Sequence, residues 1–85
     1  MKTNVQTPSR PLYEICQEIR KDWRTMPEHA RAHFRAIEHA NSIDEMYGSD
    51  SVEMEVCYFL GNAQTWKGEV ARRIKIELKK LAGLK

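Results

Sequence analysis

The sequence predicts an all-α fold, namely a compact single-domain bundle of about four helices. Apolar residues recur at steps of three and four in several stretches, which is the spacing of an amphipathic helix. Glycine or proline stands between those stretches, and the one apolar run that could form a strand has no second run to pair with. The 85 residues suffice for one domain and are too few for two. We expect residues 1–8 to form a flexible tail and residues 9–85 to form a single helical domain.

The first helix is expected over about residues 12–26. Ser9 and Pro11 mark its start, because proline is tolerated in the first turn, where its missing N–H has no partner to lose. Six apolar side chains then fall on one face: Leu12, Ile15, Cys16, Ile19, Trp23 and Met26.

A second helix is expected over about residues 27–40. Thr25 and Glu28 have the spacing of a capping box, with Pro27 inside the first turn. Pro27 also ends the preceding helix, since proline disfavours helical geometry in the residue before it. The apolar stripe of this helix is weak and depends on two large side chains, Phe34 and Ile37.

Residues 41–51 form the main interruption. A capping-box pattern begins at Ser42, but Gly48 stops any helix within about a turn. We expect a short helical turn that carries Met46 and Tyr47 inward, followed by a loop. Asp50 is expected to cap the next helix.

The third helix is expected over about residues 51–60 and the last over about 66–82. Residues 56–60 are apolar all round, which suits a central buried helix; a strand is the alternative, and the lack of a partner strand favours helix. Thr65 is expected to cap the last helix. Its inward stripe comprises Val70, Ala71, Ile74, Leu78 and Leu81.

Location and redox state follow from simple absences in the sequence. No apolar run approaches the roughly 18–20 residues that cross a bilayer, and no apolar stretch follows the N-terminal residues as in a secretory signal. We therefore expect a cytoplasmic protein in a host cell, with no membrane partner. Cys16 and Cys57 lie in apolar helical patterns, so reduced thiols are preferred over a disulfide.

Charge is segregated along the chain although the net charge is only +2. Residues 1–35 hold seven basic and four acidic residues, residues 36–66 hold six acidic residues and no Lys or Arg, and residues 67–85 hold seven basic and two acidic residues. The acidic middle can pair with the chain's own basic ends or present a bipolar surface to a partner.

No pattern indicates catalysis, a cofactor or a metal. His29 and His33 have the spacing of a helical metal pair, but the glutamate of an HExxH motif is missing, and two surface histidines are the preferred interpretation. Both cysteines are expected to be buried, no serine is flanked by glycines, and the four glycines form no phosphate loop. We expect a non-enzymatic protein.

The basic last helix is the clearest candidate binding element. Arg72, Lys75 and Lys79 fall along one line and so could meet successive phosphates. Trp66 is interpreted first as a core residue or a staple for this helix, with an anchor at a binding surface as the alternative. The candidate binding residues are Trp66, Lys67, Arg72, Arg73, Lys75 and Lys79.

Several segments resemble a group of small proteins from phages and integrated mobile elements. They are Ile15–Trp23, Tyr47–Ser51, Tyr58–Ala63, Trp66–Lys75 and Glu77–Lys79. The resemblance covers about two-thirds of the chain and implies a setting rather than catalytic residues. Small phage proteins often bind host proteins, including defence complexes, so an inhibitor of the anti-CRISPR kind is what this setting suggests.

The favoured function is a non-enzymatic phage or mobile-element accessory protein that binds a macromolecular partner, with a host or phage protein ahead of nucleic acid. The alternative is a small helix–turn–helix DNA-binding protein that uses the basic C-terminal helix. A structural component of a virion is a third option. Homodimerisation is left open, because small helical domains often offset a thin core in that way.

Overall fold

The computed structural model describes residues 10–83, so the expected tail at residues 1–8 lies outside the described part of the chain. Within it, the elements are α1 (Leu12–Asp22), α2 (Glu28–Ile37), β1 (Met46–Tyr47), β2 (Asp50–Ser51), α3 (Val52–Gly61) and α4 (Glu69–Leu81). The prediction of a mostly helical fold with four helices is confirmed for these residues.

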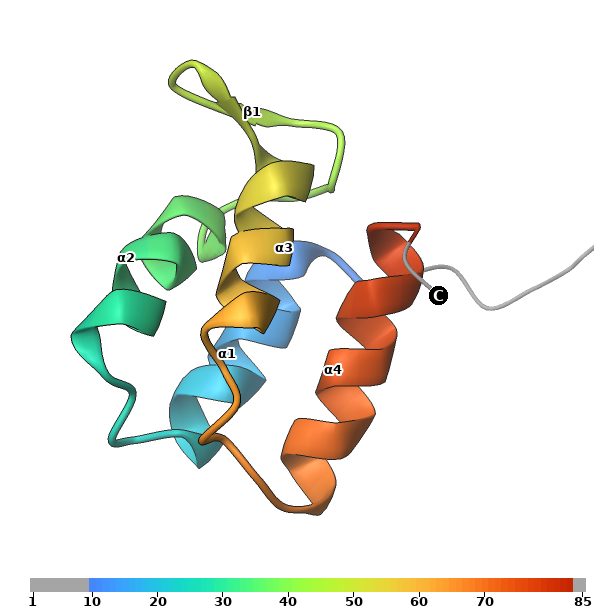
Figure 1. Cartoon of the computed structure of the whole chain (residues 1–85). Helices are drawn as coiled ribbons and strands as arrows, with labels where there is room; N and C mark the ends of the chain where they lie inside the picture. Colours follow the sequence, from blue (N-terminus) through green and yellow to red (C-terminus); the bar gives the residue numbers. More distant parts are fainter. Residues whose placement is uncertain (1–9, 84–85) are drawn as a thin grey trace, which may run out of the picture.

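The chain direction alternates from one helix to the next, so that α1 and α3 run opposite to α2 and α4 (Figure 1). The connections between α1 and α2 and between α3 and α4 lie at one end of the bundle, and the β1–β2 hairpin projects from the other. The start of α1 is held by two backbone donors, since the Leu12 and Tyr13 N–H groups bond to the carbonyls of Asn41 and Ala40 at 3.1 and 2.8 Å. These bonds satisfy amides that a helix start otherwise leaves without a partner.

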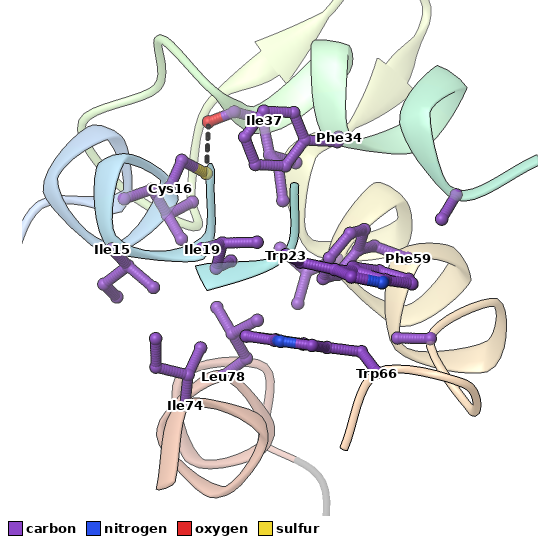
Figure 2. Close-up of a cluster of buried hydrophobic side chains, with 14 of the residues drawn as sticks. Ile15, Cys16, Ile19, Trp23, Phe34, Ile37, Phe59, Trp66, Ile74 and Leu78 are labelled. Carbon is purple, nitrogen blue, oxygen red and sulfur yellow. Dashed lines mark hydrogen bonds between the residues drawn. The ribbon is translucent and has the colours of Figure 1, made fainter. Parts of the chain in front are cut away.

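The core is the set of inward stripes that the helical spacing predicts (Figure 2). Ile15 and Ile19 of α1, Phe59 of α3 and Ile74 and Leu78 of α4 are completely buried. Trp23 and Trp66 lie nearly parallel beside them, with ring centroids 5.5 Å apart and an interplanar angle of 8°. Stacking of this kind adds to the free energy gained from burying the two rings.

Three predicted helix ends and two predicted caps are wrong. α2 ends at Ile37 rather than near residue 40, and α4 begins at Glu69 rather than near residue 66. α1 ends at Asp22 rather than near Met26, and the Trp23 N–H bonds to the Ile19 carbonyl at 2.7 Å as the last helical contact. Trp23 and Met26 are nevertheless buried, because the segment that connects α1 to α2 packs these two side chains against the core. The predicted caps Thr25 and Thr65 do not cap, since α2 begins after Pro27 and α4 after Gly68, neither with a side-chain hydrogen bond.

The predicted inward helical turn at Met46 and Tyr47 is also wrong. These residues form β1, which pairs antiparallel with β2, and their side chains are 62% and 53% exposed. Gly48 adopts a φ of 63° in the connecting turn, a conformation that glycine adopts without a steric penalty. Asp50 lies in β2, and Ser51 caps α3 instead by accepting a hydrogen bond from the Met54 N–H at 3.0 Å.

No helix within residues 10–83 combines the length and the apolar character needed to span a bilayer.

Candidate binding surfaces

The core packing of α4 decides which of its side chains are available. Ala71, Ile74 and Leu78 are buried against the bundle, so the opposite sides of the helix carry most of its charges into solvent. The exposed basic side chains on or just before this helix are Lys67, Arg72, Arg73, Lys79 and Lys80, with Lys75 half-buried.

Arg73 belongs to an ion-pair network that joins α4 to α1 and to Arg10, just before α1. Arg73 hydrogen-bonds to Glu18 of α1, which also accepts from Arg10 at 3.0 Å. Arg10 in turn makes two bonds to Glu77 of α4, at 3.0 and 2.8 Å. The bond from Arg73 and then that from Arg10 lower the pKa of Glu18, and the Glu77 bond raises the pKa of Arg10. This network fixes α4 against α1.

Four other basic residues form what we call the cationic patch: Lys67, Arg72, Lys75 and Lys79. Lys75 donates a 2.7 Å hydrogen bond to the Trp66 carbonyl and lies over the Trp66 ring at 5.9 Å. Burial lowers the pKa of Lys75, and the nearby charges of Lys67 and Lys79 lower it further. Across residues 10–83, no carboxylate forms an ion pair with any member of the patch. The patch therefore holds like charges together without neutralisation.

Trp66 is part of the core. It is 2% exposed, stacks on Trp23, and donates from Nε1 to the Asp22 carboxylate at 2.8 Å. This confirms the core interpretation of Trp66, and the alternative of a surface anchor is wrong for this conformation. Trp66 thus packs in the core beneath Lys75 of the cationic patch and has almost no exposed surface.

Ile76 is the functional candidate that sequence reasoning missed. It is 51% exposed and lies out of phase with the inward stripe of α4. Its helical neighbours three and four residues away are all basic: Arg72, Arg73, Lys79 and Lys80. We call these five residues the α4 outer surface. An isoleucine outside the inward stripe of a charged helix was the sequence signal for it.

The two histidines of the considered metal pair have separate surroundings. His33 Nδ1 lies 2.7 Å from Glu55 Oε1, and Glu55 is only 6% exposed, whereas His29 is exposed. In the stretch from residue 10 to residue 83, no three His, Cys, Asp or Glu side chains gather as metal ligands would. The pair of His33 and Glu55 joins α2 to α3. It satisfies a buried carboxylate that the sequence did not single out as buried.

The acidic middle of the chain divides its charges between internal and exposed positions. Glu38 pairs with Arg20, and Glu45 accepts hydrogen bonds from the Asn41 and Ser42 backbone at 3.1 and 3.2 Å. Asp44, Asp50 and Glu53 are exposed at or near the hairpin. The two alternatives for this segment, internal pairing and a bipolar surface, therefore each hold for part of it.

Both cysteines are free thiols. Cys16 is buried and its Sγ contacts the Ile37 carbonyl at 3.7 Å. Burial raises the pKa of the Cys16 thiol to about 12, which keeps it protonated at neutral pH. Cys57 is half-buried.

Comparison of the chain with protein-family models, with curated proteins and with solved structures found no match. The surfaces above therefore carry the functional argument by themselves.

Proposed function

We propose that this chain is a non-enzymatic accessory protein that binds a protein partner through the α4 outer surface. The observation that carries the proposal is Ile76, which is 51% exposed between two pairs of basic residues. An apolar centre within a charged rim is the usual anatomy of a protein–protein interface. The complementary surface is an apolar recess edged by carboxylates.

The energetic roles of the two parts differ. Burying a fully exposed isoleucine side chain contributes about 1.5–3 kcal/mol, and Ile76 is 51% exposed, so a partner that covers it gains about half of that range. The surrounding basic residues would mainly steer the encounter and select an acidic partner. Arg72 and Lys79 form no ion pair with any residue from 10 to 83, whereas Arg73 is engaged with Glu18.

The setting of the proposed function comes from the resemblance to small phage and mobile-element proteins. In that setting the partner is a host or phage protein, and inhibition of a host defence complex is the finer form of the proposal. The fold supports binding of a partner, because the bundle buries one side of α4 and leaves its opposite sides in solvent.

The test is capture of a partner from a lysate of host cells by the immobilised full chain, with and without nuclease. We expect a protein that is retained after nuclease and is lost when the bait carries Ile76→Ser. Met54→Ser is the matched control, because Met54 is a similarly exposed apolar residue, at 47%, and belongs to α3 rather than to the α4 outer surface. Capture that is lost on nuclease treatment, or that ignores Ile76→Ser, would refute the proposal.

The second candidate is double-stranded DNA binding by α4, favoured by the line of Arg72, Lys75 and Lys79, of which Arg72 and Lys79 are exposed. A helix–turn–helix motif joins two helices at about 90–120° by a turn of three or four residues. Here residues 62–68 connect α3 to α4, and the two helices run in opposite directions along the bundle (Figure 1). This arrangement gives the DNA-binding candidate less support than the protein-binding proposal.

A gel shift distinguishes the two candidates. DNA binding predicts a salt-dependent shift of duplex DNA that is lost in the double variant Arg72→Ala/Lys75→Ala and kept in Ile76→Ser. No shift at low salt would remove this candidate and leave the protein partner.

A further inference from the structure

A hollow at the junction of α1 and α2 is lined by arginines from two segments. Arg20 and Arg24 come from the end of α1 and the residue that follows its cap, and Arg31 and Arg35 come from α2. The hollow has a volume of about 180 Å³, and we call it the arginine hollow. Its remaining lining residues are Trp23, Met26, Phe34 and Glu38.

The floor of the arginine hollow is part of the core. Trp23, Met26 and Phe34 are buried, and Figure 2 shows Trp23 between Phe34 and Trp66. The guanidinium of Arg20 lies 5.6 Å from the centre of the Phe34 ring. A rigid apolar floor holds the arginine stems in place, so less side-chain freedom is lost when a ligand binds.

The charges in the hollow are only partly neutralised. Glu38 pairs with Arg20, while the exposed Glu28 approaches Arg35 at 3.5 Å and Arg31 at 3.9 Å. Long, exposed pairs of this kind contribute little free energy and are readily displaced. Arg31 also donates a 3.0 Å hydrogen bond to the Met26 carbonyl, whereas Arg24 forms no ion pair with any residue between 10 and 83. Four guanidiniums thus face two carboxylates.

We propose that the arginine hollow binds a phosphate group, carried either by a free nucleotide or by the 5′ end of a nucleic-acid strand. The guanidiniums belong to two segments and so approach the hollow from different sides. A planar carboxylate is satisfied by one arginine fork, whereas the tetrahedral oxygens of a phosphate accept from several directions at once. A terminal phosphate carries close to two negative charges at neutral pH, which matches the excess of guanidiniums.

The size of the hollow sets how the ligand lies. A volume of about 180 Å³ is below the roughly 300–1,000 Å³ of pockets that enclose a whole drug-sized ligand, so only the phosphate enters. A neighbouring hollow of about 350 Å³ shares Arg20 and Glu38 and is also lined by Tyr13 and His39. Tyr13 is exposed there and offers a ring on which a base can stack. The nucleoside part of the ligand would lie along this second hollow.

The first test is an NMR titration of the ¹⁵N-labelled full chain with pyrophosphate, followed by the arginine Nε–Hε signals and the amides around the hollow. We expect saturable shifts confined to the junction of α1 and α2. The double variant Arg24→Ala/Arg35→Ala should weaken binding by at least about tenfold, since two charge-assisted contacts are removed. Arg24→Lys/Arg35→Lys keeps the charge and should still weaken binding, because the guanidinium fork is lost.

The matched control is Lys67→Ala/Lys79→Ala, which removes the same charge from the cationic patch on α4. Binding of pyrophosphate should change by less than about twofold in this control, because neither Lys67 nor Lys79 lines the arginine hollow. Equal weakening by both double variants would overturn the proposal in favour of nonspecific attraction to a basic protein. Saturable binding of poly-glutamate with the same affinity at the same residues would overturn it as well.

The source of the phosphate is resolved by comparing an oligothymidine with a 5′-phosphate, the same strand without it, and a thymidine mononucleotide. Preference for the phosphorylated strand over the mononucleotide supports a nucleic-acid end, and equal affinity supports a free nucleotide. No preference for the 5′-phosphate over the unmodified strand would contradict recognition of a terminal phosphate. The arginine variants leave Ile76 intact, so partner capture through α4 should persist in them, and the two proposals fail independently.

Discussion

Individual residues show where sequence reasoning about side chains succeeds and where it stops. Helical spacing placed Ile15, Ile19, Ile74 and Leu78 in the core correctly, because burial follows the 3.6-residue period. The burial of Trp66 was ambiguous, because a residue before a helix has no periodic neighbours to fix its direction. Its contacts with Trp23 and Asp22 span 43 and 44 residues and have no local signature.

Trp66 should therefore be a stability residue. Trp66→Ala removes a buried ring and its stacking with Trp23, and we expect a loss of about 3–5 kcal/mol in the free energy of unfolding. Ile76→Ser should change it by less than about 0.5 kcal/mol, because that side chain is half exposed. Urea denaturation followed by circular dichroism measures both. A stable Trp66→Ala variant would contradict the assignment of Trp66 to the core.

At the scale of elements, the existence and type of the four helices followed from the sequence, but three of their ends did not. Thr25 and Thr65 have the residue type of a cap, and a helix capped by either would begin at the next residue. α2 instead begins two residues after that position, at Glu28, and α4 three residues after it, at Glu69. The hairpin was missed because strands of two residues carry no period that a sequence pattern could show. The sequence correctly predicted that Gly48 prevents a longer helix, but the turn that contains Gly48 joins the two strands of the hairpin.

Gly68 gives a direct test of how α4 begins. It has a φ of 111°, which an L-amino acid with a side chain rarely adopts, and a Cβ placed there would meet nothing within 4 Å. Gly68→Ala should thus destabilise the fold by about 1–3 kcal/mol through backbone strain alone. Gly61→Ala is the control, because Gly61 has no positive φ and equally open surroundings. Equal thermal stability of the two variants would show that α4 starts differently.

The contact between α1 and α4 should make stability depend on pH. Arg73 and Arg10 lower the pKa of Glu18 below its usual value of 4.5, so the ionised form is favoured in the folded state. Stability from Glu18 is present above pH 4.5 and is lost as the pH falls through the lowered pKa of the folded state. Denaturation midpoints between pH 3 and 6 should decline less steeply in Glu18→Gln than in the unmodified chain.

Glu53→Gln is the control for this profile, because Glu53 forms no ion pair among the residues placed in the structure. An unchanged slope in Glu18→Gln, matching that of Glu53→Gln, would mean that the network does not hold α4 against α1.

At the scale of the whole molecule, the fold converts charge segregation along the chain into separate surfaces. Two carboxylates of the acidic middle pair within the chain, Glu38 with Arg20 and Glu55 with His33. The sequence had left open whether such internal pairs form. The connection between α1 and α2 and the start of α4 lie at the end opposite the hairpin (Figure 1). The candidate site was predicted in part: the basic residues of α4 were named from the sequence, whereas Ile76 and the arginine hollow needed the packing of the helices.

The central claim is that α4 binds a partner around an apolar centre. The most direct measurement is the dissociation constant of the captured partner with the unmodified chain, with Ile76→Ser and with Met54→Ser. We predict about threefold to tenfold weaker binding for Ile76→Ser, equivalent to the burial of the exposed half of its side chain, and no change for Met54→Ser. Wild-type affinity in Ile76→Ser would contradict the claim.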